Sequence, residues 1–104
     1  MEQNYMEHIK HLMDVYEEAQ EELMSAQDYS KKMHGASDSE NKAMYMAMAR
    51  QELEHESKLL EAGDRIIRSM PADAHREFMD MVWGNLKKHL HKWRLDIESK
   101  MQPA

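Results

Sequence analysis

Apolar residues recur at intervals of three and four along most of the chain, as they do on one face of an α-helix. Two breaks interrupt the pattern, one at residues 33–38 and one at residues 69–73. Pro71 cannot continue a helix, and Gly35 suits the left-handed residue that often ends one. The pattern therefore predicts three helices, over residues 3–34, 38–69 and 73–100.

The two breaks also carry residues that can start a helix. Ser37 with Glu40 three residues later is typical of a capping box, and Asp73 or Ser69 can cap the third helix. Because the links are short, we expect the first two helices to lie antiparallel, as a long helical hairpin. The predicted fold class is all-α, with a single domain over residues 1–104 in which a third helix follows the hairpin.

Ionisable residues interrupt the apolar seams of the first two predicted helices. Glu22 is the only charged member of the first seam, which consists of Leu12, Val15, Ala19, Glu22, Ala26, Tyr29 and Met33. Glu52 and His55 interrupt the second seam, which consists of Tyr45, Met48, Glu52, His55, Leu59, Ala62 and Ile66.

Two further stripes are apolar throughout. One runs parallel to the second seam and widens that face, through Met46, Ala49, Leu53, Leu60, Gly63, Ile67 and Met70. The other is the predicted core face of the third helix, through Phe78, Val82, Leu86, Leu90, Trp93, Ile97 and Met101. Aromatic and methionine side chains at this spacing indicate a packed core.

Composition narrows the class of protein. With 104 residues the chain is one domain at most, and without cysteine it can form no disulfide or thiolate metal site. A net charge of −6 disfavours nucleic-acid binding. No apolar run of about 18 residues predicts a membrane span, and the polar start lacks the apolar core of a signal peptide. We therefore expect a cytoplasmic protein without nucleic-acid or membrane partners.

Glu22, Glu52 and His55 are candidate metal ligands. On a helix, residues three apart share a face, so Glu52 and His55 can reach one ion. Glu22 precedes the first break by about as many residues as Glu52 follows it, so antiparallel helices bring the three level. An unpaired buried carboxylate is unfavourable, which calls for a counter-charge or a metal. Glu54 and Glu56 point away from the seam and are not assigned as ligands.

Two interpretations of this trio remain open. In the first, all three side chains face solvent at the edge of the seam, or His55 simply hydrogen-bonds Glu22. In the second, they form half of a carboxylate-bridged dimetal site. The complete site takes a Glu from each of two helices and a Glu-x-x-His from each of two others, inside a four-helix bundle. One chain supplies one of each, so two copies related by a two-fold axis would complete both the bundle and the ligands.

The segment around these residues resembles the encapsulated ferritins, short members of the ferritin-like superfamily. The matching stretches are Glu21-Glu22-Leu23 through Tyr29, the turn Ala36-Ser37-Asp38, and Arg50-Gln51-Glu52-Leu53-Glu54-His55. In that family a metal-binding Glu precedes a Tyr by seven residues, and a Glu-x-x-His follows about thirty residues later. Those positions are Glu22, Tyr29, Glu52 and His55 here.

The resemblance implies an iron-storage ferroxidase that oxidises Fe(II) to Fe(III) with O2. Two chains would assemble a di-iron centre from Glu22, Glu52 and His55 of each, with Tyr29 beside it as a hydrogen-bond donor or merely as part of the core. Zn, Mn or Ca could substitute for iron in a crystal. The implied assembly is a homodimer or higher even-numbered homo-oligomer that completes a ferritin-like four-helix bundle. An encapsulin shell is the implied partner and compartment, although residues 98–104 do not resemble the family's targeting peptide.

Two other functions are compatible with the same residues. One is a non-catalytic helical oligomerisation or adaptor module, in which the polar seam residues only set the register of the helices. The other is a dimetal oxidase that consumes peroxide with the same ligands. Metal content distinguishes the adaptor module from a ferroxidase, and peroxide turnover distinguishes the dimetal oxidase from a ferroxidase.

Overall fold

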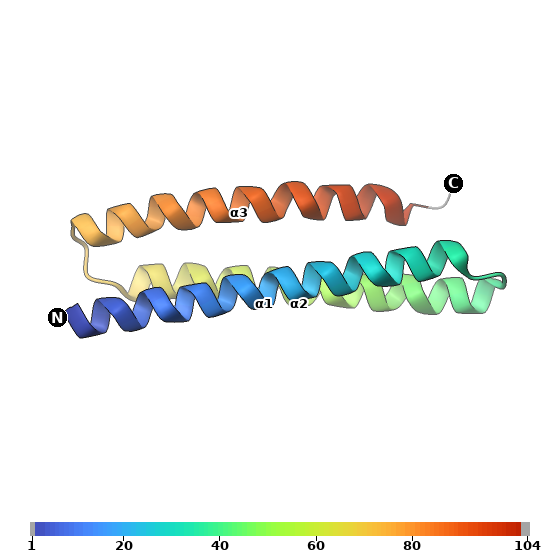
Figure 1. Cartoon of the computed structure of the whole chain (residues 1–104), viewed down its shortest axis with the longest axis horizontal. Helices are drawn as coiled ribbons and strands as arrows, with labels where there is room; N and C mark the ends of the chain where they lie inside the picture. The colour runs from blue at the N-terminus through green and yellow to red at the C-terminus, as the bar shows by residue number, and fades with distance from the viewer. Residues whose placement is uncertain (1, 103–104) are drawn as a thin grey trace.

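The computed structural model describes residues 2–102, with side chains from Tyr5 onward, and these residues form three α-helices (Figure 1). The helices are α1 (Glu2–Gly35), α2 (Ser39–Ser69) and α3 (Ala74–Met101). No strand occurs among the described residues, so the all-α class is confirmed. The predicted bounds agree with the observed ones to within one residue at every helix end. The last two residues of the 98–104 segment lie outside the described part.

The three helices form an elongated molecule with extents of 57 × 19 × 14 Å. α1 and α2 run side by side in opposite directions, and α3 lies along this pair, pointing the same way as α1 (Figure 1). The α1–α2 pair projects beyond the end of α3 on the side of the link between α1 and α2 (Figure 1). None of the described helices combines the length and the apolarity needed to cross a membrane.

Carboxylates cap the second and third helices. The Asp73 side chain accepts a hydrogen bond from the Arg76 backbone N at 3.1 Å, which confirms it as the cap of α3. At α2 the predicted cap is wrong, because Asp38 and not Ser37 takes that position. One Asp38 oxygen accepts from the Asn41 backbone N at 2.7 Å and the other accepts from the Asn41 side chain at 2.8 Å. A carboxylate with both oxygens bonded outcompetes the neighbouring hydroxyl for the end of the helix.

Gly35 also differs from expectation. It is the last residue of α1, and none of the described glycines has a positive φ. The helix closes instead through a hydrogen bond from the Ala36 backbone N to the Met33 carbonyl at 3.3 Å. A tightened last turn of this kind needs no left-handed residue.

The core lies between the α1–α2 pair and α3. The first seam is confirmed, since its members Leu12, Ala19, Ala26 and Met33 are buried. On α2 the parallel stripe is the buried face, whereas the seam that contains Glu52 lies half-exposed at its edge. The buried residues of the stripe are Ala49, Leu53, Gly63, Ile67 and Met70.

The predicted stripe of α3 holds in its second half and is wrong in its first. Leu90, Ile97 and Met101 are buried as expected. At the start of α3, however, Met79 and Trp83 are buried and Phe78 is 56% exposed. The cause is the position of the Trp83 ring, which lies against Gly63, where the absence of a Cβ leaves room for it. Anchoring this ring turns Met79 toward the core and Phe78 toward solvent.

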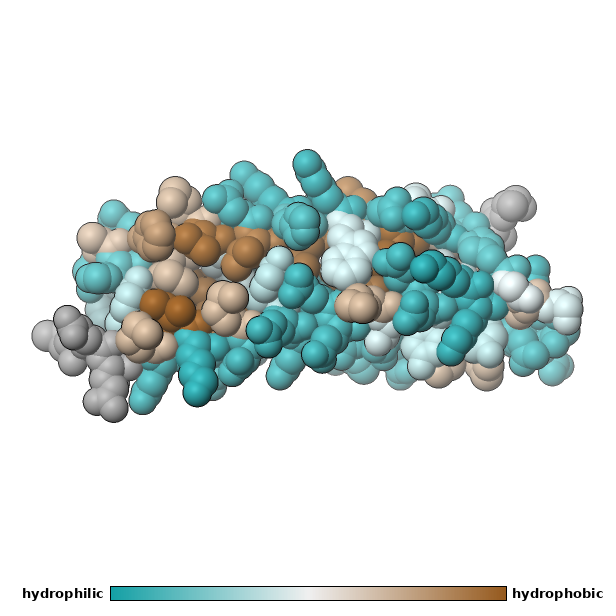
Figure 2. Space-filling model, viewed as in Figure 1, coloured by the Kyte–Doolittle hydropathy of each residue, from teal (hydrophilic) through white to brown (hydrophobic). Residues whose placement is uncertain are grey.

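Exposed apolar side chains gather where α1 and α3 begin (Figure 2). Three of the most exposed large apolar residues, Met6, Phe78 and Met81, belong to these segments, with exposures of 61%, 56% and 59%. The rest of this view is largely polar (Figure 2).

Candidate metal centre

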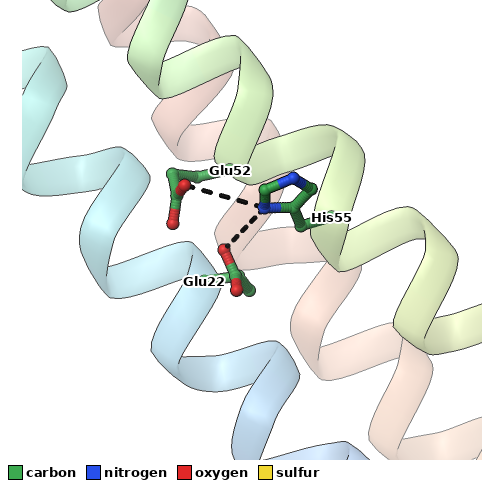
Figure 3. A group of neighbouring side chains, drawn as sticks. All are labelled: Glu22, Glu52 and His55. Atoms are coloured by element: carbon green, nitrogen blue, oxygen red, sulfur yellow. Dashed lines mark ion pairs between the residues drawn. The ribbon is translucent and has the colours of Figure 1, made fainter.

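α1 and α2 bring Glu22, Glu52 and His55 into one cluster (Figure 3). His55 Nδ1 lies 3.5 Å from Glu22 Oε2 and 3.7 Å from Glu52 Oε1. The predicted alignment of these residues across the two helices is therefore observed. It follows from two regular antiparallel helices joined by a three-residue link, residues 36–38.

The cluster occupies the side of the α1–α2 pair that α3 does not cover, and α3 passes behind it in Figure 3. The side chains of Glu22 and Glu52 are 26% and 22% exposed, and that of His55 is 48% exposed. The carboxylates are thus partly withdrawn from water, whereas the imidazole stands at the rim. Solvent, an ion or another chain can reach all three from this side.

The electrostatics of the cluster are unfavourable without a further cation. Glu22 Oε2 is buried and has no hydrogen-bond partner in the described structure. A hydrogen bond with Glu22, burial and repulsion by the Glu22 carboxylate together raise the pKa of Glu52, and His55 only partly opposes this effect. Glu22 and Glu52 therefore share His55 as their counter-charge, and His55 is positive only when it is protonated.

The donor atoms have the spacing of a metal site. One ligand atom from each residue lies within 4.8 Å of the others, and no other His, Asp or Glu group among residues 5–102 meets this criterion. Carboxylate oxygen and imidazole nitrogen together suit iron, zinc and manganese. The residues present therefore fit a divalent transition metal, which would also give Glu22 Oε2 a partner.

Glu56 is the ionisable residue whose burial sequence reasoning missed. It points away from the cluster, as expected, and it is fully buried. Its Oε1 accepts a 2.8 Å bond from Arg94 Nη1, which also donates to the Leu53 carbonyl and Ser57 Oγ. The signal in the sequence that could have revealed this burial is Arg94, a cation beside the apolar residues of the third helix. Glu54, by contrast, is exposed.

Tyr29 lies on the same seam as Glu22, two helical turns closer to the link between α1 and α2. Its ring stacks on that of Tyr45 with centroids 6.4 Å apart, and Lys32 Nζ lies 5.5 Å from its centroid. Among the described residues no hydrogen bond joins the Tyr29 hydroxyl to the cluster. Its role as a donor beside the metals stays a prediction.

Comparison with known proteins finds no family model that matches the chain, and no similar curated protein or solved structure. The functional argument therefore rests on the geometry and chemistry of the cluster.

Proposed function

We propose that the chain binds iron at Glu22, Glu52 and His55 and oxidises Fe(II) to Fe(III). One observation carries the proposal, namely that two carboxylates and an imidazole converge in a partly buried cluster, in which Glu22 Oε2 has no hydrogen-bond partner. A structural cluster would be expected to contain a lysine or arginine that neutralises the acids. A cation supplied from solution serves the same purpose here.

The proposed site is shared between two chains. Three protein ligands leave several coordination positions of an iron ion unfilled, and a second copy related by a two-fold axis would double the set. Half-buried apolar side chains lie on the same two seams as the cluster, which suits an interface. They are Val15 and Tyr29 of α1 with Tyr45, Met48, Leu59, Ala62 and Ile66 of α2. Pairing through this side would form a ferritin-like four-helix bundle from two α1–α2 pairs, in a homodimer or a larger even-numbered assembly.

The ligands also explain why oxidation is favoured. Anionic oxygen donors stabilise Fe(III) more than Fe(II), because the attraction grows with the charge of the ion. Glu22 and Glu52 supply these charges, and His55 holds the ion at the rim of the cluster. Two Fe(II) ions would each give one electron to the same O2, which with two protons from solvent would leave as hydrogen peroxide. The resemblance to encapsulated ferritins extends the proposal to iron storage and to an encapsulin shell as recipient of the Fe(III).

Anaerobic addition of Fe(II) followed by air tests the proposal. We expect a rise in ferric absorbance for the wild-type chain and a loss of at least about tenfold in initial rate for Glu52→Ala. Glu54→Ala is the matched control, because Glu54 is an exposed acid on the same helix outside the cluster. Equal rates for the wild type and Glu52→Ala would refute the proposal.

Metal content measured together with solution mass tests the shared site. We expect one iron per chain and an even number of chains. A metal-free monomer would exclude a shared site, and a metal-free oligomer unchanged by alanine at all three ligands would indicate an adaptor module. Peroxide consumption without accumulation of Fe(III) would indicate a peroxide-consuming oxidase.

A further inference from the structure

The surface that α3 covers on the α1–α2 pair continues past the end of α3. The last turn of α3 is held where the His34 ring nitrogen hydrogen-bonds the Lys100 carbonyl. Beyond that point the α1–α2 pair projects without a covering helix (Figure 1). A groove of about 580 Å³ lies there, with an apolar floor formed by Met33, Ala43, Met46 and Ala47.

The rim of this groove is cationic. Lys42, Arg50 and His34 line it, and no acidic residue is among its described lining residues. Lys42 and Arg50 are exposed, and neither takes part in an ion pair with any residue from 5 to 102. They are eight residues apart, which corresponds to about 12 Å along the helix axis. The groove thus presents positive charge at both ends of an apolar strip.

This spacing defines the ligand that fits. Lys42 and Arg50 leave the helix about 12 Å apart, so a ligand with two anionic groups at a similar spacing can meet both cations without bending either side chain toward the other. A helix with two acidic residues seven positions apart places its charges about 10.5 Å from each other. An apolar side chain between them, three or four positions along, would then lie on the same face and reach the floor.

α1 itself carries this pattern on its outer surface. Glu21, Met24 and Asp28 are spaced three and four residues apart and all are exposed, with Met24 at 57%. We call these three residues the ridge. Neither acid of the ridge forms an ion pair within the described chain. We propose that the groove of one copy binds the ridge of a second copy of this chain.

The contact differs from the pairing that would complete the metal cluster. The groove lies on the side of α3 and the ridge on the outer side of α1, whereas the cluster opens away from α3. Because the groove and the ridge are different surfaces, the contact can join more than two copies into a larger assembly. It rests on complementary charge around a small apolar patch, so it weakens as salt screens the charges.

Charge reversal on each side tests the contact by sedimentation velocity at low salt. The groove variant carries Lys42→Glu and Arg50→Glu, and the ridge variant carries Glu21→Lys and Asp28→Lys. Either variant alone should require at least about tenfold more protein to reach the wild-type assembly. An equimolar mixture should recover assembly, because each acidic surface then meets a basic one.

Matched controls separate this effect from a general change of charge. Lys58→Glu with Arg65→Glu reverses two exposed cations of α2 outside the groove and should assemble like the wild type. Met24→Glu removes the apolar contact and should also weaken assembly. Circular dichroism must show all variants equally helical.

Two results would overturn the proposal. One is an unchanged mass of the groove and ridge variants at all concentrations, and the other is a mixture that assembles no better than its components. Failure here is distinguishable from failure of the ferroxidase proposal. The groove variant keeps Glu22, Glu52 and His55, so Fe(II) oxidation with altered assembly supports both proposals. Oxidation with unchanged assembly refutes only the contact between groove and ridge.

Discussion

Glu52 and Glu56 stand one helical turn apart on α2, about 40° apart around the helix axis, but in different surroundings. On the side covered by α3, Glu56 is fully buried and bonds to Arg94 at 2.8 Å. On the open side, Glu52 is 22% exposed and faces Glu22 and His55. Glu56 is thus paired with a permanent cation of the protein, although its Oε2 has no hydrogen-bond partner, as is also true of Glu22 Oε2. Glu52 is instead placed next to a second acid.

The comparison suggests how a structural carboxylate can be told from a ligand. Burial alone does not separate them, because the more buried of the two is the structural one. What separates them is the partner, since Arg94 is always charged whereas His55 is charged only when protonated. A side of the molecule that lacks its own cation is the one expected to recruit a metal ion.

The largest expected effect follows from removing the cation on the covered side. Arg94→Met leaves the Glu56 carboxylate buried without a counter-charge, and also removes the donor to the Leu53 carbonyl. We expect the free energy of unfolding to fall by about 3–5 kcal/mol. Urea denaturation followed by circular dichroism measures this change.

A matched control uses the other carboxylate that Arg94 contacts. Glu98 is exposed and pairs with Arg94 Nε at 2.9 Å, so Glu98→Gln should lower stability by less than about 0.5 kcal/mol. Equal effects of the two substitutions would mean that Glu56 gains nothing from its buried partner.

The next largest effect concerns the fit of α3 on the covered side. A Cβ added at Gly63 would lie 2.1 Å from the Trp83 ring, so the rigid ring and α3 must move. We expect Gly63→Ala to lower the free energy of unfolding by about 1–3 kcal/mol. Thermal unfolding measures the loss, and near-ultraviolet circular dichroism reports the changed environment of Trp83.

Gly84 provides the control for this substitution. It lies within α3, and a Cβ there meets no atom of the described structure within 4 Å. Gly84→Ala should raise stability by about 0.5–1 kcal/mol, because alanine is the better helix former. A loss of stability at both positions would show that contact with Trp83 is not the cause.

Sequence reasoning correctly predicted that Glu22, Glu52 and His55 come together. Spacing of three and four residues places Glu22, Glu52 and His55 on seams, and two helices with a short link leave one antiparallel register. Both arguments depend only on local geometry and chain length. For the same reason the predicted helix bounds agree closely with the observed ones, because Pro71 and Asp73 influence only the few residues next to them.

The covered side was predicted less well because it depends on packing between distant segments. The burial of Glu56 requires Arg94, which lies 38 residues away, and the rotation of α3 requires Trp83 to meet Gly63. Phe78 and Met79 are adjacent and both apolar, so the spacing of apolar residues cannot decide which of them faces the core. The contact between the Trp83 ring and Gly63, which has no side chain, decides that Met79 faces the core.

A smaller effect is expected at Asp64, which ties α3 to the covered side. Burial works to raise the pKa of Asp64, but hydrogen bonds from Lys87 and Trp83 and the charges of Lys87 and Arg68 outweigh it and lower the pKa. A carboxylate with a lowered pKa stabilises the fold above its ordinary value of 3.8, and this contribution is lost as the pH falls through the lowered value.

Asp64→Asn should therefore lower stability by about 0.5–1 kcal/mol at pH 7, after allowance for solvent screening of a partly exposed pair. The difference from the wild type should shrink toward pH 3, as urea denaturation at pH 7, 5 and 3 can show. The exposed pair of Asp96 with Lys100 provides the control, and Asp96→Asn should change little at any pH. A difference that persists unchanged at pH 3 would exclude the carboxylate as its source.

The smallest expected effect is a gain in stability from a substitution at Glu52. It tests the comparison of Glu52 with Glu56 most directly. The raised pKa of Glu52 means that the folded state holds this proton more tightly than the unfolded state, so stability from this group is lost as the pH rises through that pKa.

In chelator at pH 7, Glu52→Gln should therefore stabilise the metal-free chain by about 0.5 kcal/mol. The same substitution one turn away, Glu56→Gln, should destabilise it, because Arg94 then loses its buried carboxylate partner and keeps only the exposed Glu98. With Mn(II) added, the wild type should gain thermal stability and Glu52→Gln should gain much less, because one metal ligand is missing. Destabilisation by Glu52→Gln in chelator would mean that this carboxylate supports the fold as Glu56 does.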